Sequence, residues 1–192
     1  MIIYQLIRPL AYLRIKHPAK WRVDWALPAG VALVCAALHY GFRGHVNVFG
    51  AGGIVSLVLG FVQNLPGFYI AALAAIATFG RTDIDEIMPG SPPPRLETAT
   101  VNGGVNLIEL TRRRFLCLLF AFLTVECVAL TLGSVLVLSA VPAIVECIGD
   151  RETLLRIVSA FGVFFYCLVL TQLMIATLWG LYYLGERIHQ PD

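Results

Sequence analysis

Charged residues are scarce in this sequence: Lys, Arg, Asp and Glu make up 14% of the 192 residues, whereas 58% are hydrophobic. A soluble domain usually contains about 25% charged and about 45–50% apolar residues. The mean hydropathy of +0.79 shows the same imbalance. A chain of this length cannot bury so much apolar surface in a core of its own. The composition therefore excludes an ordinary soluble domain and indicates a protein that is solvated by lipid.

Catalytic and cofactor-binding motifs are missing as well. The sequence contains no Walker A, GxGxxG, HExxH, GxSxG or CxxC pattern, and its four histidines are far apart. The cysteines form an odd, scattered set that is typical of small hydrophobic residues rather than of a disulfide framework, although Cys147, outside the apolar runs, could pair between subunits. We therefore expect no enzyme, no metal site and no cofactor. The five cysteines are Cys35, Cys117, Cys127, Cys147 and Cys167.

Long apolar runs are what the sequence does contain. A helix needs about 20 apolar residues to cross the hydrocarbon core of a bilayer. Helices form there because they pair their own backbone amides. The sequence therefore predicts an all-α membrane protein, a four-transmembrane-helix bundle within residues 25–185, with Pro142 at the expected end of the third span. The four predicted spans are about 25–42, 54–79, 115–141 and 154–184.

Positive charges are distributed unevenly between the connections. Lys and Arg stay on the cytoplasmic side of a membrane. The segment 1–24 and the loop 80–114 carry ten of them, whereas the other two connections and their flanks carry three. We therefore expect a bacterial inner-membrane protein whose amino terminus, loop and tail 186–192, which holds Arg187, are cytosolic. The ten are Arg8, Arg14, Lys16, Lys20, Arg22, Arg81, Arg95, Arg112, Arg113 and Arg114, and the three are Arg43, Arg151 and Arg156.

The segment 1–24 is predicted to be an interfacial helix. Pro9 and Pro18 interrupt it, and it lacks the apolar core of a signal peptide. Its apolar residues alternate with basic ones, which suits a short helix in the headgroup region. Trp21 and Trp25 follow where aromatic anchors belong. A simple lead-in to the membrane and a partner-binding arm both remain open. The apolar residues are Ile2, Ile3, Leu6, Ile7, Leu10 and Leu13.

The loop 80–114 is the largest polar stretch of the sequence. The prolines at 92–94 favour an extended path. The turn signal at 102–104 could join two short strands around 99–101 and 105–108. The arginines of the loop are expected to contact lipid phosphates or a cytosolic protein partner, and they are too few to predict direct nucleic-acid binding. They are Arg81, Arg95, Arg112, Arg113 and Arg114.

Polar residues inside the predicted spans are the candidates for a membrane function, because each is costly in hydrocarbon. Glu126 lies near the middle of the third span and must face protein or water, or be protonated. Gln172 lies near the midpoint of the fourth span, and Gln63 and Asn64 lie in the second. Three roles fit this intramembrane polar cluster: hydrogen bonds that hold helices or subunits together, the lining of a pore or proton path, and a protonation switch.

A proline and a glycine interrupt the second predicted span. Pro66 inside a helix frees a backbone carbonyl and bends the helix. Gly67 and a run of alanines that includes Ala71 and Ala75 follow it, and such small residues let another helix approach closely. The sequence predicts a packing surface here, with the Pro66-Gly67 pair as a candidate hinge.

Three stretches carry a resemblance to known proteins: LPGFYIAALAAIATF (65–79), GRTDID (80–85) and LTRRRF (110–115). In these stretches the chain resembles small four-span bacterial proteins that are encoded among anti-phage genes, such as the membrane subunit of the Kiwa defence system. The resemblance implies a homo-oligomeric membrane sensor of phage infection. Such a sensor holds a cytosolic, nucleic-acid-binding partner subunit through its inner loops. No individual functional residue is carried over from this resemblance.

Together these observations predict a non-enzymatic membrane sensor or scaffold that forms homo-oligomers and holds a cytosolic effector protein, with a role in phage defence. The alternative prediction is an oligomeric pore that conducts ions past Glu126 and the nearby amides. A small transporter ranks third, because the chain shows no inverted repeat.

Overall fold

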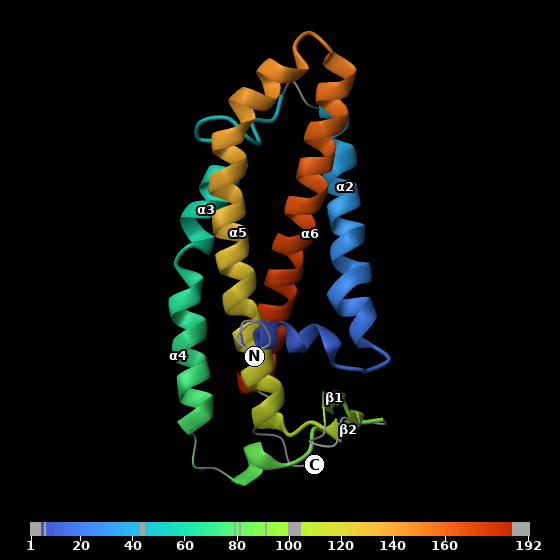
Figure 1. Cartoon of the computed structure of the whole chain (residues 1–192), viewed down its shortest axis with the longest axis vertical. Helices are drawn as coiled ribbons and strands as arrows, with labels where there is room; N and C mark the ends of the chain where they lie inside the picture. The colour runs from blue at the N-terminus through green and yellow to red at the C-terminus, as the bar shows by residue number, and fades with distance from the viewer. Residues whose placement is uncertain are drawn as a thin grey trace. The chain divides into compact units, whose positions relative to one another are not determined.

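The computed structural model describes residues 5, 7–42, 45–78, 80, 82–90, 92–99 and 105–185 (Figure 1). The described chain is mostly helical. It contains four helices that are long and apolar enough to cross a membrane, which confirms the prediction of four such segments. Their assembly into a membrane bundle stays a prediction. The four helices are Arg22–Phe42, Ile54–Thr78, Arg112–Ile148 and Glu152–Gly185.

The chain divides into two compact units, and each is described by itself. The long helices α5 (Arg112–Ile148) and α6 (Glu152–Gly185) contribute residues to both units. The chain also passes from one unit to the other between Pro66 and Gly67. Unit 1 comprises Met1–Trp21, Gly67–Val125 and Ala176–Asp192, and unit 2 comprises Arg22–Pro66 and Glu126–Ile175.

The first apolar helix starts as a π-helix and continues as an α-helix in unit 2. The π-helix η2 (Arg22–Ala26) leads directly into α2 (Leu27–Phe42). Pro28 is buried near the start of α2, directly after this π-helix. After α2, the described part of the next connection is a compact turn. In it, the Asn47 side chain accepts a hydrogen bond from the Gly50 N–H (2.8 Å) and donates one to the Ala51 carbonyl (3.0 Å).

The second apolar helix is broken at Gln63 and Asn64, before the predicted position at Pro66. The break separates α3 (Ile54–Val62) from α4 (Leu65–Thr78). The Asn64 side chain compensates for a backbone hydrogen bond that is lost at the break, because its amide donates to the Gly60 carbonyl at 2.9 Å. Pro66 then lies in the first turn of α4, because proline disfavours helical backbone at the residue before it and is tolerated at a helix start.

The third apolar helix continues through Pro142, so the predicted end at that residue is wrong. Helix α5 runs on to Ile148 and bends near that end (Figure 1), as proline inside a helix causes. Gly149, with a φ of 58°, terminates it in the left-handed conformation that glycine adopts most easily. At 37 residues, α5 is about 55 Å long, which exceeds the roughly 30 Å of a hydrocarbon core.

Short elements of unit 1 complete the described structure. The amino-terminal segment forms the 3₁₀-helix η1 (Arg8–Arg14), and a second 3₁₀-helix, η3 (Thr82–Asp85), follows α4. Strands β1 (Arg95–Ala99) and β2 (Val105–Glu109) pair antiparallel, with Arg95 opposite Glu109 and Leu96 opposite Ile108. The predicted hairpin is therefore present, with a first strand that begins earlier than expected. Its predicted turn at 102–104 lies outside the described residues.

Candidate functional site: an arginine-anchored hairpin module

The best-connected polar structure in the described chain surrounds the β-hairpin of unit 1. We call it the hairpin module and define it as residues 8–20, 84–90, 92–98 and 106–114. Lys16 from the amino-terminal segment pairs with β1: its N–H donates to the Arg95 carbonyl (2.8 Å), and the Arg95 N–H donates back (3.2 Å). The Lys16 ammonium also contacts the Glu97 carboxylate at 2.5 Å. Strand β1 is thus paired on both edges, by β2 and by Lys16.

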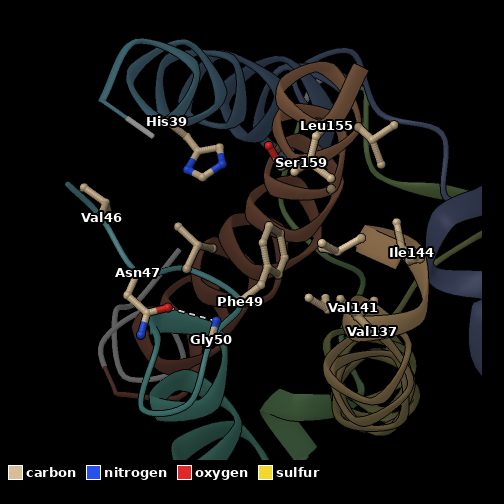
Figure 2. Close-up of a pocket in the computed structure, with 14 residues that line it drawn as sticks. His39, Val46, Asn47, Phe49, Gly50, Val137, Val141, Ile144, Leu155 and Ser159 are labelled. Carbon is tan, nitrogen blue, oxygen red and sulfur yellow. Dashed lines mark hydrogen bonds between the residues drawn. The ribbon is translucent and has the colours of Figure 1, made fainter. Parts of the chain in front are cut away.

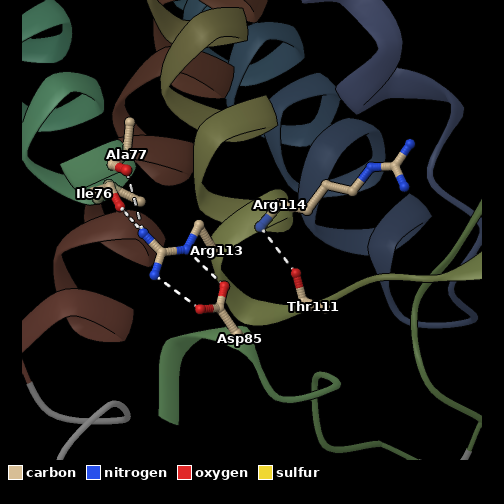
Figure 3. A network of polar contacts seen from close by, with 6 residues as sticks. All are labelled: Ile76, Ala77, Asp85, Thr111, Arg113 and Arg114. Carbon is tan, nitrogen blue, oxygen red and sulfur yellow. Dashed lines mark hydrogen bonds and ion pairs between the residues drawn. The ribbon is translucent and has the colours of Figure 1, made fainter. Parts of the chain in front are cut away.

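Arg113 joins two segments of the module to the end of α4 (Figure 3). Its guanidinium donates to both carboxylate oxygens of Asp85, at 2.6 Å and 2.9 Å, in the two-pronged geometry that arginine favours. It also donates to the carbonyls of Ile76 (2.9 Å) and Ala77 (3.3 Å) at the end of α4, where helical carbonyls lack intrahelical partners. The Arg113 guanidinium lowers the pKa of Asp85 below its ordinary value. One side chain therefore fixes the end of α4, η3 and the start of α5.

The neighbouring residues at the start of α5 also bind the module. The Thr111 hydroxyl accepts a hydrogen bond from the Arg114 N–H at 3.3 Å, which caps the first turn of the helix. The Arg112 N–H donates to the Glu86 carbonyl at 2.9 Å, and its buried guanidinium lies 3.7 Å from the Glu86 carboxylate. The sequence LTRRRF therefore ends one strand, caps one helix and ties both to the segment that follows η3.

The structure places the predicted contact arginines mostly against their own chain. Arg95 pairs with Glu109 across the hairpin at 3.0 Å, and Arg112 and Arg113 pair with acidic residues of the module. The Arg114 side chain points away from the Arg113 network (Figure 3). Arg81 lies outside the described residues. Sequence analysis suggested lipid or partner contacts for this set, and the structure shows that three of its members hold the module together.

A buried aromatic cluster fastens the amino-terminal segment to the module. Tyr12 is 1% exposed. Its ring stacks on Phe122, with centroids 5.0 Å apart, and lies 6.0 Å from the ring of Phe115. The Lys20 ammonium lies 4.0 Å from the centre of the Tyr12 ring, which is within the range of cation–π attraction. The described segment is therefore packed in place at Tyr12 as well as hydrogen-bonded at Lys16.

The 3₁₀ geometry of η1 sorts its residues into three lines, because side chains three apart eclipse each other in this helix. The first line, Ile7, Leu10 and Leu13, is apolar and exposed. The second contains Arg8 and Arg14 with Ala11 between them. The third contains Tyr12 and Ile15, which are buried. One short helix thus has a packed face, a basic line and an exposed apolar line.

Strand β2 leaves one edge open in the described part of the chain, since residues 105–109 pair only with β1. Arg95 directs its backbone bonds to Lys16, and Leu110 donates to Pro94. By the alternation of an antiparallel ladder, the peptide groups of Leu107 and its strand neighbours at i±2 point outward. Leu107 is 54% exposed and Ile108 39%. An open strand edge with apolar side chains is the kind of surface to which another chain adds a strand.

The residues predicted as an intramembrane polar cluster are separated by burial. Within unit 2, Glu126 and Gln172 are buried, whereas Gln63 and Asn64 are exposed at the break between α3 and α4. The buried Glu126 Oε2 and Gln172 Nε2 atoms make no hydrogen bond to a described residue. Sequence analysis missed Asp24, which is 4% exposed and close enough to Glu126 for their carboxyl groups to interact electrostatically. An acidic residue between Trp21 and Trp25 was the available signal.

The predicted packing surface of α4 is exposed in the described chain. Gly67, Ala71 and Ala75 are all exposed. Helix α4 instead packs in unit 1 through Tyr69, whose hydroxyl shares a hydrogen bond of 2.5 Å with Thr177, and through Ile76, which is 1% exposed. The alanine face is therefore available to lipid or to a second chain.

No protein family, curated protein or solved structure matches this chain in the comparisons. Among the described residues, no three His, Cys, Asp or Glu side chains gather in a way that could hold a metal ion. The fold and the site together define the class of protein: a mostly helical chain with four helices that are long and apolar enough to cross a membrane, and with a hairpin module formed by its polar segments.

Proposed function

We propose that the chain is an integral protein of a bacterial inner membrane, a four-helix bundle with both termini and the hairpin module in the cytosol. Three observations support this layout. The four long helices have the required composition. Ten of the fourteen Lys and Arg residues fall in 1–24 and 80–114, as cytosolic segments require. The helix η1 has the exposed apolar line and the basic line of an interfacial helix.

Within that layout, the chain acts as a non-enzymatic sensor or scaffold subunit that holds a cytosolic protein partner and assembles with copies of itself. The observation that carries the proposal is the open edge of β2 on a module that is fastened to the start of α5. A partner that adds a strand at Leu107 is thereby coupled to a helix long enough to cross the membrane. The resemblance of residues 65–85 and 110–115 to anti-phage membrane subunits is the reason to propose this role in phage defence.

Co-purification in mild detergent, with expression from the native operon, tests the proposal. A wholly monomeric chain without a stoichiometric partner would count against it. The sharper test is Leu107→Pro, because proline removes an outward N–H while the ladder to β1 stays intact. Leu107→Thr is the matched control, since threonine keeps both the N–H and the strand propensity. We expect partner loss with proline and retention with threonine. Equal retention would exclude strand addition at this edge.

Chemical labelling from outside intact cells tests the orientation separately. A cysteine placed at Pro89, which is exposed in the hairpin module, should react only after the membrane is permeabilised. Cys147 lies near the connection on the other side and is exposed, so it should react in intact cells. The reverse pattern would invert the layout and remove the basis for a cytosolic partner.

A second candidate function is an oligomeric pore or ion-conducting protein. The buried, electrostatically interacting carboxyl groups of Asp24 and Glu126 favour it, because intramembrane acids commonly mark ion or proton paths. A liposome flux assay separates the two candidates. Ion flux through the wild-type chain that is abolished by Glu126→Gln supports the pore. Liposomes that show no flux with either the wild-type chain or the variant support the scaffold.

A further inference from the structure

Unit 2 contains a pocket of about 420 Å³ between helices α2, α5 and α6 and the 46–50 turn (Figure 2). Helix α5 contributes a line of side chains at 137, 141, 144 and 145, and α6 contributes residues at 155, 158, 159 and 162. Both sets follow the spacing of one helix face. The pocket belongs to neither the hairpin module nor the buried acidic pair.

The lining of the pocket contains no Asp, Glu, Lys or Arg side chain and is mostly apolar. Its polar side chains are His39, Asn47 and Ser159. Asn47 uses its amide on Gly50 and Ala51, and the Ser159 hydroxyl donates to the carbonyl of its own helix three residues earlier, at 3.0 Å. These groups stabilise the walls, so the pocket offers little to a charged ligand, which would lose its hydration without a compensating ion pair.

The pocket is preformed by close packing around Phe49. A Cβ atom at Gly162 would lie 3.2 Å from the Phe49 ring, so the glycine lets the ring approach α6. The His39 ring meets Phe49 edge to face, with centroids 6.3 Å apart. Phe49 also packs against a core of Val48, Val55 and Val163. The aromatic wall is therefore held from several sides.

The polar side chains His39 and Asn47 lie together on one side of the pocket. Figure 2 shows them there with Val46 between them, and Val137, Val141 and Ile144 on the other side. A ligand that matches this arrangement has a long apolar part and an uncharged polar end. The volume falls within the range of small-molecule sites. A bilayer supplies molecules of this kind to any pocket between helices that it surrounds.

We propose that this pocket is a binding site for one acyl chain of an amphiphile, with its apolar part against the α5 valines and its polar end toward His39. The site requires that the helices lie in lipid, which rests on the proposed membrane layout, and it does not depend on a cytosolic partner. It assigns a ligand-binding role, which the hairpin module does not have, to the 46–50 turn and the parts of α2, α5 and α6 beside it.

Photolabelling of the full chain in liposomes tests the proposal, with a diazirine-bearing monopalmitoylglycerol, whose polar end is uncharged, as the probe. We expect saturable labelling that unlabelled monopalmitoylglycerol competes away, on peptides that cover 137–145 and 155–162. Val141→Trp fills the pocket and should lower labelling about tenfold at probe concentrations well below the dissociation constant, which corresponds to about 1.4 kcal/mol of lost binding. Leu136→Trp introduces the same side chain on the same helix at a position that is 70% exposed, and should leave labelling unchanged.

A second variant, on another helix, tests whether loss of labelling comes from the pocket rather than from misfolding of Val141→Trp. Gly162→Leu pushes the Phe49 ring toward the pocket from α6 and should also reduce labelling. Amide exchange along α2 and along residues 126–136 of α5, which belong to unit 2, reports independently that this unit remains folded. Labelling that rises linearly with probe, spreads evenly over exposed helix faces, or falls equally with both tryptophan variants would overturn the proposal. Partner retention in Leu107→Thr is unaffected by any of these outcomes, so the two proposals fail separately.

Discussion

Truncation of Tyr12 to alanine should release the amino-terminal segment from the hairpin module. The Tyr12 side chain is 1% exposed and stacks on Phe122, with the ring of Phe115 at 6.0 Å and the Lys20 ammonium 4.0 Å from its centre. Tyr12 is the largest fully buried side chain of the described amino-terminal segment. Its removal leaves a cavity that only the backbone of η1 could fill.

The expected cost follows from these contacts. Truncation of a buried large aromatic side chain to alanine costs about 3–5 kcal/mol. Part of this is the geometry of the ring pairs, about 0.5–1.5 kcal/mol each, and part is the cation–π contact, about 0.5–2 kcal/mol. Tyr12→Phe keeps the ring and all three contacts. It loses at most the hydrogen bond of the hydroxyl group, about 0.5–1.5 kcal/mol.

Amide hydrogen exchange in nanodiscs measures the difference between Tyr12→Ala and Tyr12→Phe at the contact between the amino-terminal segment and β1. The N–H groups of Lys16 and Arg95 bond each other's carbonyls, so they exchange when the segment opens. A loss of about 3 kcal/mol corresponds to more than 100-fold faster exchange. We expect this for Tyr12→Ala and only a small change for Tyr12→Phe, with the amides of α6 unchanged in both variants.

The outcome that would refute the reasoning is equally specific. If Lys16 and Arg95 exchange at similar rates in the alanine and phenylalanine variants, the Tyr12 ring does not hold the segment. If all helices exchange faster together, the residue stabilises the whole chain rather than this docking. In either case the amino-terminal segment could not be treated as part of the hairpin module.

Three further predictions test other parts of the structure. The Arg113 contact lowers the folded-state pKa of Asp85. The stability that this contact contributes should therefore be fully present above the unfolded-state pKa, near pH 4, and should be lost as the pH falls through the lower folded-state pKa. Thermal unfolding of the module as a function of pH measures this loss, and Asp85→Asn, which cannot ionise there, is the control that should not show it. Cys35 and Cys167 both pack against the Val48, Val55 and Val163 cluster of unit 2, so mild oxidation should cross-link them within one chain, as a mobility shift that Cys35→Ala abolishes. Gly180→Leu should destabilise unit 1 by about 1–3 kcal/mol through overpacking, because even a Cβ there would lie 3.2 Å from a side chain of α5; a denaturation midpoint equal to that of the wild type would contradict the packing.

The helices were predictable because length and continuous hydropathy decide them. The hairpin was predictable too, because the asparagine and two glycines at 102–104 separate two short runs with strand propensity. Helix ends were less predictable. Pro142 stops a helix only if the preceding carbonyls cannot be satisfied, and in α5 the helix bends instead. The break in the second span falls at Asn64, whose side chain replaces a lost backbone hydrogen bond to Gly60. Hydropathy cannot predict this replacement of a backbone donor by a side-chain donor.

The candidate site was less predictable than the fold, because its parts are far apart in sequence. Arg113 could be identified as important from the run of arginines, but its partners, Asp85 and the end of α4, follow only from the way the chain returns through η3. Asp24 was overlooked because it lies between two tryptophans at a predicted membrane boundary, where an acidic residue is expected to be solvated. Burial of a polar side chain is a tertiary property, and periodicity does not report it.

Three consecutive arginines at the start of α5 are unfavourable for the helix itself, because the amino-terminal end of a helix dipole is positive. The structure shows what offsets this. Arg112 lies against Glu86, and Arg113 binds Asp85 and the carbonyls at the negative end of α4. The same charges that favour a cytosolic position for this connection therefore also fold it. For that reason the orientation of the chain and the integrity of the hairpin module cannot be altered independently at Arg113: a neutral residue there removes a topology signal and, in the same step, the contact that joins α4, η3 and α5.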